Sequence, residues 1–263
     1  MSRLPTALLS RIEDAGLNAS APPQQRWIDG WLVRFSPGKA QRARCVQPVA
    51  GGRLAIDDKL ALAAMVYAEA KLPMVVRITP FALPRGLDVH LEALGWAAHQ
   101  DTRVMVAPLA QLATDAAKAE SLPRGLVFER LGLAAFAQAI GALRGSPLAQ
   151  REAHAERLEA APVPFRPLAV RRKSDGALLA CGQFAREAEL VGLYDIFTVP
   201  AARGQGLARR LCARLLSLAQ AEGARVAYLQ VEGANADARA VYARLGFADA
   251  YAYHYRVRPG DRA

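Results

Sequence analysis

The sequence has 263 residues, 52% of them hydrophobic, and a formal net charge of +10, which suits one large or two modest domains with buried cores. No apolar run approaches the roughly 18 residues needed to cross a bilayer, and the opening segment lacks the apolar centre of a signal peptide. These properties exclude disordered and membrane-spanning classes and predict a cytoplasmic protein without a membrane partner.

In the first half of the chain, helix and strand patterns alternate. A helix is predicted over 5–16 and ended by Gly16, and the stretches 31–35 and 41–49 predict a hairpin around an SPGK turn. The other predicted elements of this half are a helix at 57–71, a strand at 74–79, a helix near 85–94 and a strand at 101–108. The polar stretch of small residues at 109–125 is interpreted as a linker.

The second half continues this alternation with longer strands. Its predicted elements are a strand at 126–131, helices at 133–143 and 147–160, strands at 165–173, 177–187 and 189–199, a helix at 206–222, a strand at 226–231, a helix at 235–244 and a strand at 249–257. The helix at 206–222 carries Leu207, Leu211 and Leu215 on one face, which predicts burial of that face against the core.

The chain also repeats itself. Residues 91–108 overlay residues 242–259 without a gap at an offset of 151 residues, and at the same offset the strand at 75–78 falls on 226–229. We interpret this match as two copies of one βαβαβ-like unit. Chance similarity between alanine-rich helices is the alternative.

Cysteines and histidines are too scattered to predict a metal site. The 3 cysteines and 4 histidines show no spacing typical of metal ligands, and we expect no metal. The arginines are equally dispersed, without blocks of like charge or interleaved aromatic residues, so we expect a solvated basic surface and no nucleic-acid partner. A nucleic-acid binder is the alternative, and it would show an affinity for DNA or RNA that falls steeply with salt.

The stretch VPAARGQGLARRL at 199–211 lies between a predicted strand and a predicted helix. The first N–H groups of a helix are unpaired and attract anions. Gly204 and Gly206 have no Cβ, so a diphosphate can approach the backbone there, and Arg203 adds a positive charge. A simple tight turn between a strand and a helix is the alternative.

A second motif follows the next predicted strand, in the stretch ANADARAVYARLGF at 234–247. Ala238, Tyr242 and Leu245 share one helical face, so an ordinary core role is the alternative for Tyr242. That helical face does not explain Asn235.

Together, the two motifs resemble the signatures of the GNAT superfamily, the GCN5-related N-acetyltransferases, over residues 125–258. The matching positions are Arg203, Gly206, Ala208, Asn235, Ala238, Tyr242, Gly246 and Phe247. The resemblance implies an α/β (α+β) fold of two GNAT-like mixed-sheet domains in tandem, at 1–120 and 121–263, with a central twisted sheet flanked by helices. It also implies splayed strands in the C-terminal copy, where the strand at 193–199 bulges away from the strand at 226–231 and leaves a slot.

The same resemblance implies acetyl-CoA as the cosubstrate, with its pyrophosphate at the loop 203–208 and its pantetheine arm in the slot. Where the strands part, backbone N–H groups have no ladder partner, so they can bind the pantetheine amides and polarise the thioester carbonyl. The expected cofactor-binding residues are Phe197, Thr198, Val199, Arg203, Gly204, Gln205, Gly206, Leu207, Ala208, Asn235 and Ala238.

Three residues are candidates for proton transfer. The Tyr242 phenol, with an ordinary pKa of about 10, can donate a proton or a hydrogen bond to the departing thiolate. Asp195 and Glu232 lie on the two strands that flank the expected slot, and either can take a proton from the amine through a water. The alternative for both acids is a surface or structural carboxylate.

The cofactor motifs are missing from the first half. The four residues that replace Arg203, Gly206, Asn235 and Tyr242 at the offset of 151 are Gly52, Ala55, Pro84 and Leu91. We therefore interpret 1–120 as a degenerate copy that completes a sheet or walls the acceptor pocket together with the loop near 143–150.

We expect an N-acetyltransferase that transfers an acetyl or related acyl group from acetyl-CoA to a primary amine by direct attack in a ternary complex. Its partner would be a small-molecule or peptide amine, and it would work as a monomer or homodimer. The alternative is a non-catalytic acyl-CoA-binding or ligand-sensing module, which would keep the cofactor loop and would not need Tyr242.

Overall fold

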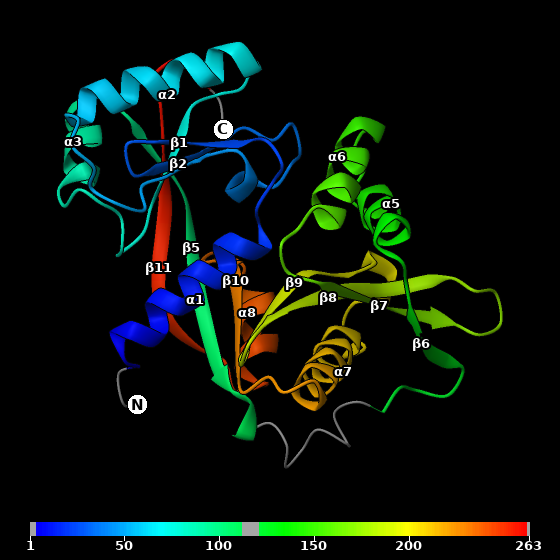
Figure 1. Ribbon diagram of the computed structural model, residues 1–263. Coiled ribbons are helices and arrows are strands. Elements are labelled where there is room, and N and C mark those ends of the chain that lie inside the picture. Colours follow the sequence, from blue (N-terminus) through cyan, green and yellow to red (C-terminus); the bar gives the residue numbers. More distant parts are fainter. Residues whose placement is uncertain (1–3, 112–120, 262–263) are drawn as a thin grey trace.

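The computed structural model describes residues 4–111 and 121–261 and places the described strands in one mixed sheet of 11 strands. The strand order is β1-β2-β3-β4-β11-β5-β10-β9-β8-β7-β6 (Figure 1). The first half contains α1 (Thr6–Ala19), β1 (Gln25–Ile28), β2 (Trp31–Arg34), η1 (Gln41–Ala43), β3 (Val46–Gln47), α2 (Ile56–Ala70), β4 (Val75–Ile78), α3 (Leu87–Ala93), β5 (Ala97–Pro108) and η2 (Leu109–Gln111). The second half contains β6 (Leu126–Arg130), α5 (Leu133–Leu143), α6 (Leu148–Glu159), β7 (Phe165–Arg172), β8 (Leu178–Glu187), β9 (Leu190–Thr198), η3 (Pro200–Ala202), α7 (Leu207–Ala221), β10 (Val226–Glu232), α8 (Ala236–Ala243) and β11 (Ala248–Val257).

Much of the predicted linker at 109–125 falls outside the described residues, and the predicted domain boundary after residue 120 lies at the edge of that gap. Among the helices of the described ranges, none is long and apolar enough to cross a membrane.

One expectation for the N-terminal region was wrong, and one strand there was not predicted. Helix α1 does not end at Gly16 but continues to Ala19. A Cβ on Gly16 would lie 2.9 Å from Nε2 of Gln230, so this glycine permits close packing of α1 on β10 instead of stopping the helix. In addition, β2 pairs with β3 as part of the expected hairpin but also with β1, a strand that the sequence pattern did not predict.

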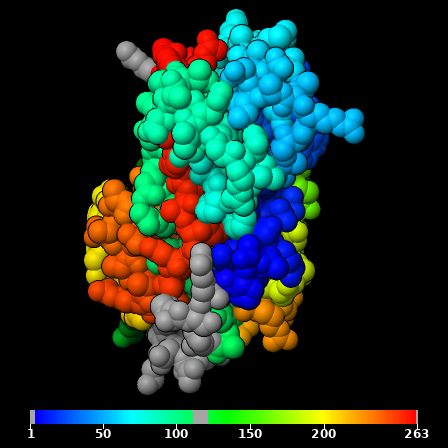
Figure 2. All heavy atoms as spheres, turned by 90° about the vertical axis from the view of Figure 1, so that its left-hand side faces the viewer, coloured from blue at the N-terminus to red at the C-terminus, as the bar shows by residue number. Residues whose placement is uncertain are grey.

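The two halves exchange their last strands. Strand β11 pairs antiparallel with β4 and β5 of the first half, while β5 pairs antiparallel with both β10 and β11 (Figure 1). In the first half, β4 therefore pairs with β11, the last strand of the second half. In the second half, β10 pairs with β5, the last strand of the first half. In the space-filling view, red atoms of the C-terminal segment lie against cyan and green atoms of the first half (Figure 2).

Element bounds reproduce the repeat. Helices α2 and α7 each have 15 residues, and they begin at Ile56 and Leu207, which is the offset of 151 found in the sequence. Strands β4 and β10 begin at Val75 and Val226, with the same spacing. From α2 and from α7 onward, the two halves thus carry the same order of helix, strand, helix and strand.

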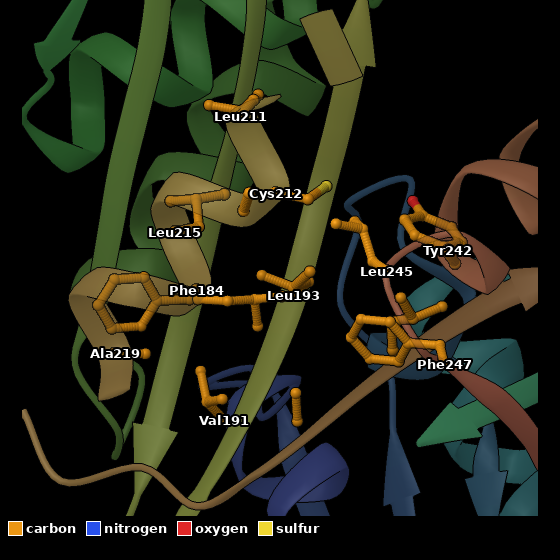
Figure 3. Packing of buried hydrophobic residues seen from close by; sticks show 14 of the residues in the cluster. Phe184, Val191, Leu193, Leu211, Cys212, Leu215, Ala219, Tyr242, Leu245 and Phe247 are labelled. Carbon is orange, nitrogen blue, oxygen red and sulfur yellow. The ribbon is translucent and has the colours of Figure 1, made fainter. Parts of the chain in front are cut away.

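Helices cover both faces of the second-half sheet (Figure 1). On one face, α7 packs its leucines, including Leu211 and Leu215, against Phe184 and Leu193 of the sheet (Figure 3). On the other face, α1 and α5 contribute Ile12 and Phe136 to a separate buried cluster, and α6 packs on α5. The strands between these two layers carry the site described next.

Candidate active site

Strands β9 and β10 separate part-way along their length. They pair in parallel only from Leu190 to Leu193 on β9 and from Val226 to Leu229 on β10. Beyond Leu193, β9 continues to Thr198 without a partner on this side. The gap expected from the resemblance is therefore present in the sheet.

A β-bulge turns β9 away from its neighbour. Asp195 and Ile196 together oppose the single residue Gly182 of β8, and Asp195 has a positive φ of 53°. A bulge adds a residue to one strand, bends it and increases its local twist. The side chain of Ile196 occupies the space that a Cβ on Gly182 would need, so glycine fits this position.

The backbone of β9 next to the gap is only partly free. The N–H of Val199 donates a hydrogen bond of 2.9 Å to the carbonyl of Leu179, so the expectation that it is free for a cofactor amide was wrong. Because hydrogen bonds alternate along an antiparallel pair, the N–H of Phe197 faces β8 and the N–H of Thr198 faces the gap. Oγ1 of Thr198 is buried and has no hydrogen-bond partner.

The glycine loop before α7 is exposed and left-handed at two positions. Gly204 and Gly206 have φ values of 77° and 72°, a region that favours glycine. Gly206 is the N-cap residue of α7, and no side chain caps this helix end. Nε of Arg203 donates a hydrogen bond of 3.3 Å to the carbonyl of Thr198, which ties the loop to the end of β9.

The equivalent loop of the first half already holds an anion. The carboxylate of Asp29 accepts hydrogen bonds of 2.8–2.9 Å from the backbone N–H groups of Arg53 and Leu54, just before α2. The buried ammonium of Lys59 lies 3.2 Å from the same carboxylate. At the offset of 151, Arg53 corresponds to Gly204. The two loops differ in backbone conformation, because the N-cap Ala55 is extended and the N-cap Gly206 is left-handed, so the Asp29 contact describes the first half alone.

Asn235 and Tyr242 both have structural roles. Oδ1 of Asn235 accepts a hydrogen bond of 3.1 Å from the N–H of Ala238, which caps α8 and explains the asparagine without any ligand. Tyr242 is 9% exposed and packs edge-on against Phe247, with its hydroxyl pointing away from that ring (Figure 3). Burial raises the pKa of the Tyr242 phenol, so the hydroxyl stays protonated at neutral pH.

A cavity of about 510 Å³ lies next to the gap between β9 and β10. Its wall is built from both halves of the chain: β9, β10, α5, α6 and α8, and the first-half segment 38–43 with Ser36. The sequence-predicted site residues that line it are Asp195, Glu232, Asn235, Ala238 and Tyr242. The glycine loop at 203–206 and the residues 197–199 do not line this cavity.

The two candidate acids differ in their surroundings. Asp195 accepts hydrogen bonds of 2.8 Å from Nη1 of Arg144 and 2.9 Å from Nε2 of Gln183, and Nε2 of His154 lies 3.4 Å away. Burial alone would raise the pKa of Asp195, but His154 and Arg144 outweigh it and hold this pKa well below its usual range. Glu232 is exposed, and among the described residues its carboxylate accepts a 2.7 Å hydrogen bond from Gln100 of β5 and no other.

Family comparisons agree with this geometry. Residues 137–247 match the model of the Acetyltransferase (GNAT) family, and residues 6–125 match the family described as "Probable histone acetyltransferase Rv0428c C-terminal". The second half of the chain contains a GNAT acetyltransferase domain. The first and second halves thus match two different family models.

Solved structures of GNAT proteins share the fold of this chain. A GCN5-related N-acetyltransferase from Kribbella flavida has a TM-score of 0.63 at 17% identity, with 95% of each chain covered. A tandem GNAT protein from the clavulanic acid biosynthesis pathway has a TM-score of 0.61 at 17% identity, covering 83% of this chain and 76% of that one. No curated protein matches the chain.

Several cavity residues of this GNAT protein were missed by the sequence analysis. They are Arg42, Arg144, Arg151, His154 and Arg157. Three of them follow one another at intervals of three residues on α6, which places them on one side of the helix. This three-residue spacing could have predicted a basic face on the helix from the sequence. The loop near 143–150, which was expected to wall the pocket, does contribute Arg144, Ser146 and Gln150 to the wall.

Proposed function

We propose that this GNAT protein transfers an acetyl group from acetyl-CoA to a primary amine by direct attack in a ternary complex. The observation that carries the proposal is the gap between β9 and β10, which meets a cavity large enough for a small-molecule acceptor. Both reactants can then meet at the gap, the thioester from the side of α7 and the amine from the side of α6.

The loop from Arg203 to Ala208 would bind the pyrophosphate through its backbone amides. Support comes from the exposure of Gly204 and Gln205, which lie directly before the N-terminus of α7, a helix end that no side chain of the described residues caps. Arg203 adds the positive charge that a diphosphate needs.

The pantetheine arm would lie in the gap. The N–H of Thr198 faces it, because the N–H of the next residue, Val199, points the other way to Leu179 of β8. Phe197 and Ala238 would supply apolar contact, and Asn235 would act by fixing the start of α8.

In the reaction, the amine nitrogen attacks the thioester carbonyl carbon, and the C–S bond breaks as the N–C bond forms. We assign proton donation to the leaving sulfur to Tyr242, whose raised pKa keeps its proton available. Glu232 is assigned as the group that takes the amine proton through a water, because its carboxylate is exposed and bonded only to the neutral amide of Gln100. Asp195 would hold Arg144 and His154 in place, since its low pKa makes it a poor proton acceptor.

Titration of the purified protein with acetyl-CoA, followed by measurement of thiol release with a panel of primary amines, tests this function. Binding with amine-dependent thiol release is the expected result. Binding without turnover for any amine would support the alternative of an acyl-CoA-binding or ligand-sensing module, and absence of binding would overturn both.

A further inference from the structure

The wall of the cavity carries more positive than negative side chains. Five basic residues line it, from η1 and its approach, from the end of α5, and from α6: Lys39, Arg42, Arg144, Arg151 and Arg157. The carboxylates on the same wall are Asp195 and Glu232. A cavity lined in this way has a positive potential, which attracts anionic groups.

Three of these guanidiniums have neutral partners. Nη1 of Arg42 donates to the hydroxyl of Tyr253 at 3.2 Å, and Nε of Arg151 donates to a backbone carbonyl at 2.8 Å. Nη1 of Arg157 is 3.4 Å from the carbonyl of Ala19. Within residues 4–111 and 121–261, no carboxylate oxygen lies within 4 Å of these three side chains, whereas Arg144 is paired with Asp195.

Arg157 is the most informative of the three because it is only 8% exposed. Burial lowers the pKa of its guanidinium and outweighs the opposing attraction of Asp195, which already shares its charge with Arg144 and His154. Nε of Arg42, on the opposite wall, is also buried and has no hydrogen-bond partner. Both side chains therefore have unused capacity to bind an oxyanion.

The cofactor phosphates cannot account for these cations. The glycine loop and α7 lie on one face of the second-half sheet, whereas α5 and α6 lie on the other (Figure 1). In the first half, the carboxylate of Asp29 already accepts hydrogen bonds from the N–H groups of Arg53 and Leu54 before α2. An anion at Arg42 and Arg157 therefore fits the second reactant better than the cofactor phosphates.

We propose that the acceptor is a primary amine that also carries an oxyanion, a carboxylate or a phosphate, held by Arg157 and Arg42 in the cavity between α6 and η1. This inference rests on the proposed function. Guanidinium groups suit both anions, because their planar array of N–H donors matches carboxylate and phosphate oxygens. The amine would point from this anchor toward the gap beside Glu232 and Tyr242.

A matched series of small amines tests the proposal. Propylamine, β-alanine, phosphoethanolamine and 1,3-diaminopropane share a primary amine on a short chain and differ in the charge of the far end. We expect kcat/KM for at least one anionic amine to exceed that of propylamine by about tenfold or more, as for one charge-assisted contact, and the diamine to be poorest. The carboxylate and phosphate members distinguish the two anions. Equal or higher kcat/KM for propylamine or the diamine would overturn the proposal.

The variants Arg157→Gln and Arg42→Gln each remove one cation. Each should reduce the ratio of anionic to neutral kcat/KM severalfold while leaving the KM for acetyl-CoA unchanged, and Arg85→Gln, an exposed arginine far from the cavity, should leave both unchanged. Ratios unchanged in both cavity variants would overturn the assignment of the anion to these residues. Folding of each variant is checked by its Tm.

Calorimetric binding of the same four amines to the protein saturated with CoA provides a readout that needs no turnover. A preference for the anionic amines that is lost in Arg157→Gln supports the anion site even if no amine is acetylated, in which case only the proposed function fails. The absence of any such preference overturns the anion site even if acetylation is observed.

Discussion

The carboxylate of Asp29 accepts two hydrogen bonds, of 2.8 and 2.9 Å, from the backbone N–H of Arg53. This contact gives the loop before α2 an anion supplied by the chain itself, while the corresponding loop before α7 is open.

Replacing Asp29 should uncover that anion site. In Asp29→Ala, the N–H groups of Arg53 and Leu54 and the buried ammonium of Lys59 lose their carboxylate, so we expect a lower Tm than in the wild type. Inorganic sulfate should raise the Tm of this variant more than that of the wild type, because it can occupy the vacated position. The control is Asp58→Ala, which removes an exposed carboxylate from the first turn of α2. An identical sulfate response in all three proteins contradicts the prediction.

The stability of the protein should fall at acid pH. Burial raises the pKa of Glu13 and Asp195, but Arg77 beside Glu13 and His154 beside Asp195 outweigh burial and lower both pKa values. A carboxyl whose pKa is lower in the folded than in the unfolded chain stabilises the fold above its unfolded pKa of about 4 and loses this contribution as pH falls through the folded pKa. We expect a urea midpoint that is flat from about pH 7 to 5 and falls below about pH 4. Asp195→Asn should have a shallower acid slope, and an unchanged slope would argue against this residue as a source.

Reversing the charge of Arg203 should weaken cofactor binding. In Arg203→Glu, a carboxylate beside the pyrophosphate replaces a guanidinium, so the KM for acetyl-CoA should rise by about tenfold to a hundredfold. The kcat at saturating acetyl-CoA should change little, because Arg203 lies outside the cavity beside the gap. Arg85→Glu controls for the loss of net positive charge. A KM that stays at the wild-type value in Arg203→Glu would remove the loop from the proposed site.

Removal of the Tyr242 hydroxyl should slow the chemical step. Tyr242→Phe keeps the ring packing on Phe247 and loses only the proton donor, so kcat should fall by about a hundredfold or more while the KM for acetyl-CoA stays the same. Thiols with a lower pKa need less help in leaving, so an activated thioester should partly rescue the variant. An unchanged kcat would mean that Tyr242 serves only as a buried core residue.

The proton acceptor can be identified by comparing two neutral substitutions. Glu232→Gln should lower kcat by about a hundredfold. His154→Gln should lower kcat much less, because Nε2 of His154 faces the Asp195 carboxylate and not a free acceptor position. A larger loss of kcat in His154→Gln than in Glu232→Gln would transfer the role from Glu232 to His154.

The spacing of the two motifs predicted the local structure around the candidate site, because contacts between residues close in the chain determine that structure. The left-handed glycines, the helix start at Leu207 and the cap at Asn235 all lie within a few residues of one another in the chain. The bulge at Asp195 and the parting of β9 from β10 were expected only through family resemblance, since no local pattern in the strand requires them.

Long-range placement could not be obtained from the same patterns. Because β5 and β11 are repeats of each other, the sequence alone does not tell which of them pairs with β4 and which with β10. The basic side of the cavity was missed for a similar reason, since Arg157 gains its importance only where α6 faces the first-half segment carrying Arg42.

The exchange of final strands has a consequence for how the protein is made. Strand β5 leaves the ribosome roughly 120 residues before β10 and 140 before β11, its only two partners in the described sheet. At typical synthesis rates of about 5–20 residues per second, β5 waits about 6–24 s with both edges unpaired before β10 emerges. Two nascent chains on the same messenger RNA are therefore able to exchange β11, each pairing its β11 with β5 of the other chain. We expect such a strand-swapped dimer to be the main misassembled form, and to increase when translation is slowed.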